Sequence, residues 1–336
     1  MEDVIIIGAG PCGLSAGIEL RKAGFDPLLL EKGPIVNSIY QYPTYMIFHS
    51  TPELLEIGEI PFNTPNEKPT RLEALTYYRT VATRNELRIR QYEQVVEVNQ
   101  IVGVQSHGNE LVGQTDHEFF QVMTTDRHGK RHTLECKHLV MATGYFDHPN
   151  RLQIPGEDLP KVFSYYKEAH PFSGQKVAIV GGNNSAVDSA LDLERAGAEV
   201  TVIYRGPELS SHVKAWTRPL FESMVNKGRI TFYTSSQVTE INQASIQVNT
   251  PGGILTLEND YVFTLIGYRP DRTMLNGLGV ETDDTTGAPL YDPETMETNV
   301  HNLFIAGVIA AGNRANSIFI ENGRHHGALI AKHMKK

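Results

Sequence analysis

The chain has 336 residues, enough for two domains, and its 40% hydrophobic content is sufficient for a core in each. Its formal net charge of −9 at pH 7 disfavours a nucleic-acid partner, because phosphate binding requires clustered lysine and arginine. No apolar run reaches membrane-spanning length and no signal-peptide pattern opens the chain, so we expect a cytoplasmic protein with a small-molecule substrate and no membrane partner. The only two cysteines, Cys12 and Cys136, exclude a disulfide framework, and the scattered histidines predict no metal site.

The first thirty residues predict a dinucleotide-binding unit. The expected elements are a strand, a glycine turn, a helix and a second strand, at residues 4–7, 8–13, 14–23 and 27–30. Gly8 permits the tight turn, Gly10 lets the backbone approach a pyrophosphate, and Gly13 allows close packing of helix and strand. Glu31 ends the second strand, where a carboxylate accepts hydrogen bonds from ribose hydroxyls. The alternative is a glycine-rich turn without a ligand.

The same unit recurs near the middle of the chain. Its strand, turn, helix and second strand are expected at residues 176–180, 181–186, 187–196 and 200–204. Arg205 follows the second strand, and an arginine at this point favours the 2′-phosphate of NADPH over a free ribose hydroxyl. The alternative for Arg205 is a solvated cation, since no second arginine follows it, and His212 or Lys214 could assist.

Three more strands are each followed by a glycine turn, at residues 142–145, 267–270 and 305–307. In a flavoprotein with two dinucleotide-binding units, the chain would cross between the domains at the first two turns, and the third turn would return it to the flavin. We therefore predict an α/β fold with two Rossmann-like dinucleotide-binding domains, the second inserted into the first. The FAD-binding domain is expected at 1–150 and 270–336, and the NADPH-binding domain at 151–269. The polar stretch 105–118 predicts only a hairpin or loop.

The glycine motifs resemble those of the low-molecular-weight thioredoxin reductase superfamily over nearly the whole chain. They read GAGPCG at 8–13, ATGY at 142–145, GGNNSA at 181–186, GYRP at 267–270 and IAG at 305–307. Longer strings are similar to those of the bacillithiol disulfide reductases, namely SIYQYPT at 38–44, VFSYYKEAHPF at 162–172 and IFIENG at 318–323. The resemblance implies FAD and NADPH as cofactors, the symmetric disulfide of bacillithiol as substrate, and a homodimer or higher homo-oligomer.

With this resemblance, the expected cofactor-binding residues lie in the glycine turns and beside them. They are Gly8, Gly10, Pro11, Gly13, Glu31, Lys32, Tyr42, Val96, Thr143, Gly144, Gly181, Asn183, Asn184, Ser185, Ala186, Arg205, Gly307, Val308 and Ile318. Tyr42 would lie against the isoalloxazine, or else is an ordinary core aromatic. The usual Gly-Asp that holds the FAD ribityl chain reads Gly307-Val308 here.

The chain lacks the cysteine pairs of better-known relatives. Thioredoxin reductases carry Cys-x-x-Cys just after the second glycine loop, where this chain has no sulfur, so the usual thioredoxin relay is excluded. Residues 32–60 also lack the pair of the glutathione-reductase type. Any thiol chemistry must therefore use a single sulfur.

Cys12 is the candidate nucleophile. It lies at the start of the first helix, where the helix dipole is expected to lower the thiol pKa and favour the thiolate. The alternative is that Cys12 fills the small-residue position between two glycines without chemistry; Cys136 is expected to be buried and inert. Glu321 with His325 or His326 could supply the proton to the departing thiolate, since residues four apart share a helix face, and an unshifted histidine pKa suits the task.

Two functions of other classes compete with disulfide reduction. A ferredoxin or flavodoxin NADP reductase of the thioredoxin-reductase type shares both glycine loops and needs no cysteine, although the acidic balance of the chain disfavours an acidic protein partner. A flavin and NADPH redox sensor would turn over slowly with every acceptor. Flavin monooxygenases are disfavoured because their F-x-G-x-x-x-H motif is missing between residues 159 and 175.

Overall fold

The computed structural model describes residues 1–103, 117–313 and 317–335, which form two compact units. The first unit comprises Met1–Gln41, Met46–His148 and Arg269–Lys336, and the second comprises Tyr42–Tyr45 and Pro149–Tyr268. The main segment of the second unit thus interrupts the first. The short segment Tyr42–Tyr45 joins the second unit, where the Thr44 N–H donates to the Lys167 carbonyl at 2.9 Å.

Among the described residues, seven strands form the sheet of the first unit, in the order β3-β2-β1-β6-β5-β4 with β15 also paired to β6. Their bounds are β1 Glu2–Ile7, β2 Leu28–Glu31, β3 Arg88–Gln91, β4 Glu93–Gly103, β5 His117–Asp126, β6 Arg131–Met141 and β15 Leu303–Ile305. β1, β2, β3, β6 and β15 pair in parallel, whereas β4, β5 and β6 pair antiparallel. Most of the hairpin or loop expected at 105–118 lies outside the described residues.

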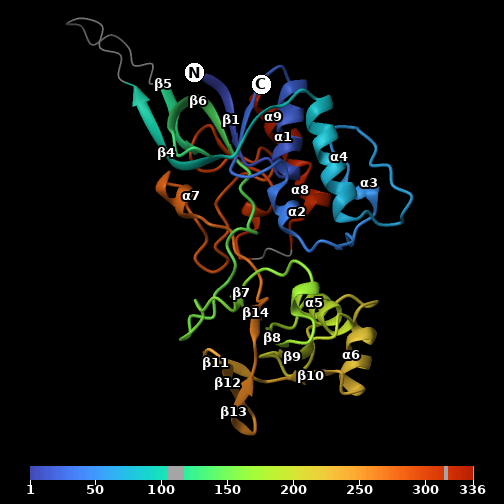
Figure 1. The fold of residues 1–336 in the computed structure, drawn as a ribbon. Helices are drawn as coiled ribbons and strands as arrows, with labels where there is room; N and C mark the ends of the chain where they lie inside the picture. The colour runs from blue at the N-terminus through green and yellow to red at the C-terminus, as the bar shows by residue number, and fades with distance from the viewer. Residues whose placement is uncertain (104–116, 314–316, 336) are drawn as a thin grey trace, which may run out of the picture. The chain divides into compact units, whose positions relative to one another are not determined.

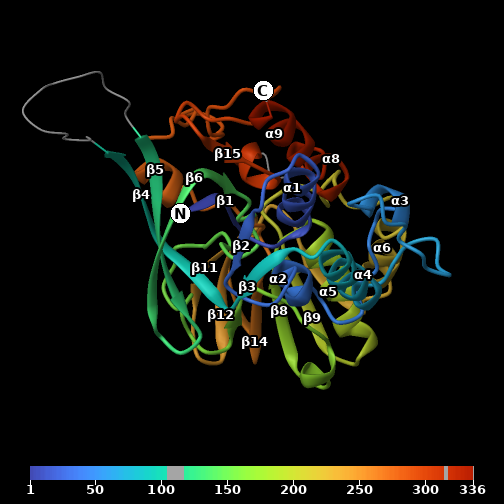
Figure 2. The ribbon, with the colours of Figure 1, turned by 90° about the horizontal axis from the view of Figure 1, so that it is seen from above.

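The first unit has seven helices among its described residues. They are α1 Pro11–Lys22, α2 Asn37–Gln41, α3 Pro52–Leu55, α4 Arg71–Arg84, α7 Thr273–Gly277, α8 Ile320–Gly323 and α9 His326–Met334, with a 3-10 turn at Val308–Ala311. α9 lies alongside α1 in both Figure 1 and Figure 2. The two helices approach so closely that a Cβ at Gly327 would lie 2.4 Å from the Ala16 Cα.

The second unit has a five-stranded parallel sheet in the order β10-β9-β8-β14-β7 and a three-stranded antiparallel sheet, β11-β12-β13 (Figure 1). The strands are β7 Val162–Phe163, β8 Lys176–Val180, β9 Glu199–Ile203, β10 Ile230–Tyr233, β11 Gln237–Ile241, β12 Ser245–Thr250, β13 Gly253–Glu258 and β14 Tyr261–Thr264. One core cluster joins the parallel sheet to α5 Asn184–Arg195 and α6 Arg218–Asn226, and another joins it to the antiparallel sheet. Both faces of the parallel sheet are therefore covered, which explains its continuous apolar strands.

Both predicted strand–turn–helix–strand units are present. β1 and β2 pair in parallel around α1, and β8 and β9 pair in parallel around α5. Each helix begins three residues earlier than its apolar spacing predicts, at Pro11 and Asn184, because polar and small residues also occupy a first helical turn. The predicted α/β fold with two Rossmann-like units is confirmed.

Candidate functional site

The first glycine turn is closed at two positions and open at a third. Gly8 has a φ of +109°, and a Cβ there would lie 2.4 Å from the Ala142 carbonyl oxygen. A Cβ at Gly13 would lie 2.1 Å from the Gly8 carbonyl oxygen. At Gly10, by contrast, a Cβ would meet no atom of the described residues within 4 Å. The turn therefore leaves space at Gly10, directly before α1, where the N–H groups of the first turn after Pro11 have no partner within the helix. These features fit a dinucleotide pyrophosphate.

Glu31 closes the same turn through its carboxylate. Its two oxygens accept the backbone N–H groups of Ala9 and Gly33, both at 2.9 Å. Burial raises the pKa of Glu31, while these two hydrogen bonds oppose the rise. The neighbouring Lys32 forms an ion pair with Asp147 at 2.9 Å. The structure thus fixes both side chains beside the turn.

The end of β6 supplies the next two predicted residues, Thr143 and Gly144. They follow Ala142, whose N–H donates to the Ile7 carbonyl of β1 at 2.9 Å, so they lie beside the first glycine turn. Gly144 has a φ of +71°, and a Cβ there would meet no described atom within 4 Å. The open space at Gly144 leaves room for a ligand at the edge of the sheet.

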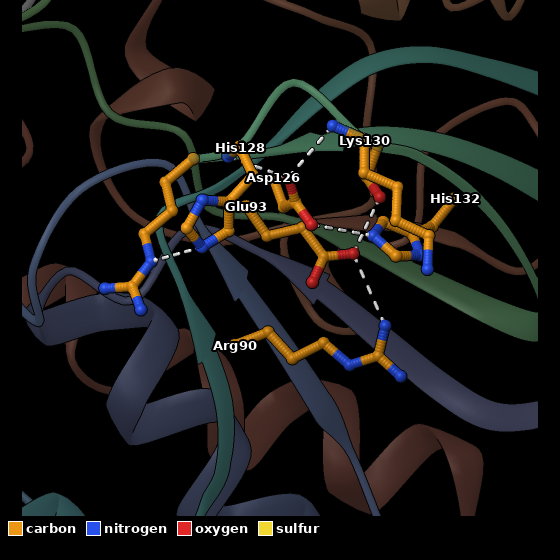
Figure 3. A network of polar contacts seen from close by, with 8 residues as sticks. Arg90, Glu93, Asp126, His128, Lys130 and His132 are labelled. Atoms are coloured by element: carbon orange, nitrogen blue, oxygen red, sulfur yellow. Dashed lines mark hydrogen bonds and ion pairs between the residues drawn. The ribbon is translucent and has the colours of Figure 1, made fainter.

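Val96 is the extra residue of a β-bulge. Pairing between β4 and β5 moves from Val95–Thr124 to Glu97–Met123, so Val96 has no position in the ladder. A polar network fixes the strands beside the bulge (Figure 3). In it, the Glu93 carboxylate accepts the Thr124 hydroxyl at 2.6 Å.

The other half of this network closes the β5–β6 turn (Figure 3). Asp126 accepts the backbone N–H groups of His128 at 2.9 Å and Lys130 at 3.0 Å, and its carboxylate contacts the His132 ring nitrogen at 3.1 Å. The His132 contact is the main cause that lowers the pKa of Asp126 to about 2. These contacts stabilise the turn into β6 at the end of β5, the strand that pairs with the bulged β4.

Cys12 lies where three segments meet. It is the second residue of α1 and is partly buried. Its Sγ would lie 3.0 Å from a Cβ at Gly307 and 2.9 Å from a Cβ at Gly323. The Gly323 position is also 3.2 Å from a side-chain carbon of Ile318. Glycine at 307 and 323 therefore makes the room that the sulfur occupies.

The predicted lowering of the Cys12 pKa is wrong. Burial, and secondarily the charge of Glu321, raise the pKa of Cys12 to about 12. Desolvation of a thiolate outweighs the helix dipole, which is worth about 1 kcal/mol or less at an exposed site. Cys136 is buried, as predicted, and its pKa is likewise raised to about 12, mainly by burial.

Glu321 and His326 do not share a helix, contrary to the prediction. Glu321 lies in α8 and His326 begins α9, because the chain turns at Arg324 and His325. The Glu321 carboxylate accepts the hydroxyl of Ser50. His326 accepts the Gly307 N–H at its Nδ1 atom, at 3.1 Å, and burial lowers its pKa, so the expectation of an unshifted histidine is also wrong.

Gly307 and Val308 open the short 3-10 turn Val308–Ala311. Gly307 has a φ of +81°, a backbone conformation that favours glycine, and its N–H donates to the His326 ring.

Two hydrogen bonds from the residue after α8 hold that helix in place. The Arg324 guanidinium donates to the carbonyls at the end of α3, those of Glu53 at 2.8 Å and Glu56 at 2.6 Å.

Ser50 and Arg324 carried no sequence signal, because their partners lie about 270 residues away along the chain. Ser15 of α1 belongs to the same group, since its hydroxyl donates to the Arg324 carbonyl at 2.6 Å. Together these contacts hold α8, and with it Gly323, against the Cys12 sulfur.

The second glycine turn has the same plan with different neighbours. A Cβ at Gly181 would lie 2.5 Å from the Leu265 carbonyl oxygen, and one at Gly182 would lie 2.4 Å from the Tyr204 ring. Asn183 caps α5 by position, without a side-chain hydrogen bond, and Ala186 is fully buried.

The remaining predicted residues of this turn differ in exposure and contacts. Ser185 and Arg205 are exposed. The Asn184 side chain donates to the His212 carbonyl and accepts the Lys214 N–H, both at 3.0 Å. Tyr42 belongs to the second unit, so its predicted contact with the flavin stays a prediction.

Two general features of the described ranges bear on function. They contain no group of three or more His, Cys, Asp or Glu side chains placed to hold a metal ion. None of their helices combines the length and apolar composition of a membrane span. What they do contain is two sheets, each with a pair of parallel strands joined through a glycine turn that opens into a helix. This arrangement is that of a protein with two dinucleotide-binding domains.

Comparison with known proteins identifies the family to which this two-domain arrangement belongs. A family model described as pyridine nucleotide-disulphide oxidoreductase matches residues 5–307. Bacilliredoxin reductase Bdr of Bacillus subtilis (strain 168) is 47% identical over 336 residues, which cover 100% of this chain and 98% of the relative. Solved structures of bacillithiol disulfide reductase Bdr (YpdA) from Bacillus cereus and Staphylococcus aureus are 48% and 45% identical, with TM-scores of 0.92 and 0.90; each match covers 99% of this chain and 98% of theirs.

The chain therefore belongs to the pyridine nucleotide-disulphide oxidoreductase family and, within it, to the Bdr reductases. It is a flavoprotein oxidoreductase that uses a pyridine nucleotide. The predicted family and enzyme class are confirmed.

Proposed function

We propose that this enzyme binds FAD at the first glycine turn and NADPH at the second, and that it reduces a small-molecule disulfide, bacillithiol disulfide. The observation that supports this choice of substrate is the full-length similarity to Bdr reductases, two of which are named for this disulfide. Different charged residues lie at the carboxyl ends of the two second strands, Glu31 at β2 and Arg205 just past β9, and they support the assignment of the two cofactors.

The proposed FAD site uses the features that fit a dinucleotide. The pyrophosphate would lie at Gly10 and the start of α1, where a Cβ would meet no described atom. Backbone groups of Val96, Thr143 and Gly144 would hold other parts of the cofactor, since Val96 lies outside the strand ladder. Bound FAD would supply the two electrons that open a disulfide.

The proposed NADPH site lies at the start of α5. The N–H groups of its first turn have no partner within the helix, and Arg205 follows the adjacent parallel strand β9. The exposed Arg205 guanidinium would form charge-assisted hydrogen bonds with the 2′-phosphate.

Cys12 would attack the substrate disulfide, and Glu321 would accept the proton of the Cys12 thiol and pass it to the thiolate that leaves. Because the pKa of Cys12 is raised to about 12, the thiol must lose its proton at the moment of attack, and Glu321 is the charged neighbour. The Cys12 sulfur then bonds one half of the substrate, and the released thiolate takes the proton from Glu321. His326 acts as a positioning residue in this scheme, since it holds the Gly307 backbone against Cys12.

The second half of the reaction opens the mixed disulfide on Cys12. This step takes two electrons, which originate from NADPH, and returns the second thiol and the free Cys12. One proton from solvent completes the balance, so two thiols leave for each NADPH consumed.

The test is NADPH oxidation by the purified holoenzyme with bacillithiol disulfide, glutathione disulfide, bacilliredoxin or ferredoxin as acceptor. We expect bacillithiol disulfide to accelerate turnover, Cys12→Ala to abolish it, and Cys136→Ala, at the second and fully buried cysteine, to leave it intact. The raised pKa of Cys12 favours one rival, an NADP reductase in which Cys12 only packs. Normal turnover by Cys12→Ala with ferredoxin as the best acceptor would establish that rival.

A further inference from the structure

The loop at residues 206–217 connects β9 to α6 and is fixed to the second unit at several points. Leu209 and Val213 are each only 5% exposed and belong to the core cluster that packs against α5. The guanidinium of Arg218 donates to the carbonyls of Leu209 at 3.1 Å and Ser210 at 2.7 Å. The 206–217 loop is therefore a fixed part of the fold.

Asn184 joins this loop to the second glycine turn. Its carboxamide donates to the His212 carbonyl and accepts the Lys214 N–H, each at 3.0 Å, on either side of the buried Val213. The carboxamide donates and accepts at once, whereas an ionised carboxylate can only accept. The Asn184 side chain thus fixes the position of the Lys214 backbone, directly after the buried Val213.

Two cationic residues, Arg205 and Lys214, belong to chain segments next to the second glycine turn. β8 and β9 are adjacent parallel strands, so Arg205 and the glycine turn lie at the same edge of the sheet. The Lys214 ammonium lies over the Trp216 ring, 5.9 Å from its centroid. In the ranges that the structure describes, neither Arg205 nor Lys214 forms an ion pair with a carboxylate. Their positive charge is available to an anionic ligand.

We propose that Asn184 is a positioning residue for coenzyme selection. It holds the 206–217 loop so that Lys214 joins Arg205 in binding the 2′-phosphate of NADPH. Lys214 then supplies the second positive charge that the sequence lacks next to Arg205. This inference rests on the proposed use of NADPH and adds the residues that select it over NADH.

The test measures binding of coenzyme fragments to the holoenzyme by calorimetry. The probes are 2′,5′-ADP and 5′-AMP, which differ by the 2′-phosphate alone. We expect Lys214→Met and Asn184→Ala each to weaken 2′,5′-ADP about five- to ten-fold while changing 5′-AMP less than about two-fold. The control Lys227→Met removes an exposed charge at the far end of α6 and leaves both affinities unchanged.

Each other outcome has a separate meaning. Unchanged 2′,5′-ADP affinity in Lys214→Met overturns the role of that lysine. Equal weakening of both ligands by Asn184→Ala shows that Asn184 only supports the fold, and it overturns the positioning role. If the wild-type enzyme binds 5′-AMP as tightly as 2′,5′-ADP, the proposed NADPH preference itself fails, whatever the variants do.

Discussion

The pH at which Cys12 ionises is the most direct prediction of the structure. Burial, with a smaller contribution from Glu321, raises the thiol pKa from its ordinary value of 9.0 to about 12. A rise of three pH units lowers the thiolate fraction at neutral pH about a thousand-fold relative to an ordinary cysteine. Because alkylation requires the thiolate, we expect Cys12 to react slowly with iodoacetamide at neutral pH, with a midpoint of the rate well above pH 9.

The perturbation is Glu321→Gln. This change removes the negative charge beside the thiol and keeps a side chain that can still accept the Ser50 hydroxyl. The pKa of Cys12 should fall, but it should stay above 9.0, since burial is the larger cause of the shift. We expect alkylation at a pH below the Cys12 pKa of both proteins to be roughly three- to ten-fold faster than in the wild type, which corresponds to a pKa lowered by half to one unit.

The assay is peptide mass spectrometry of the alkylated holoenzyme over about pH 6 to about pH 11. Cys136 is an internal control: burial also raises its pKa to about 12, but its charged neighbour is Glu2, so Glu321→Gln should leave its labelling unchanged. A wild-type midpoint for Cys12 below pH 9 would refute the reasoning, because the helix dipole would then outweigh desolvation.

Three further predictions concern stability. Gly327→Ala should destabilise the fold by roughly 1–3 kcal/mol, because its Cβ would lie 2.4 Å from the α1 backbone, whereas Gly277→Ala, with open space, should not; thermal unfolding compares them. Arg324→Gln should cost about 1–3 kcal/mol in urea unfolding through two lost hydrogen bonds to α3, and no loss would contradict their role. Asp126→Asn should destabilise at neutral pH and progressively less as pH falls from 3.8 toward about 2, since its lowered pKa stabilises only the ionised form; a loss independent of pH would contradict the His132 contact.

Local patterns predicted the fold well. The two strand–turn–helix–strand units could be read from the sequence because apolar runs, glycine spacing and strand-end charges all lie within about thirty residues of one another. The placement of Tyr42–Tyr45 could not, since nothing in that segment indicates its hydrogen bond to Lys167.

The candidate site was less predictable because it depends on contacts distant in sequence. The helix dipole at Cys12 is a local feature and was expected, but the opposing burial comes from Gly307 and Gly323, about 300 residues away. Glu321 was expected to pair with a histidine of its own helix, and its hydroxyl partner is instead Ser50. Such contacts depend on how distant segments fold back onto α1, which local patterns do not encode.

The two glycine turns also show why coenzyme choice does not lie in the turn alone. At the first turn, the Glu31 carboxylate accepts N–H groups from the turn itself, so the acid is part of its closure. At the second, the Tyr204 ring fills the corresponding space beside Gly182, and the charged group that follows is exposed. In the proposed NADPH site, a second cation from another segment would add to the contact made by Arg205. The 206–217 loop, anchored through Asn184, is the element placed to provide it.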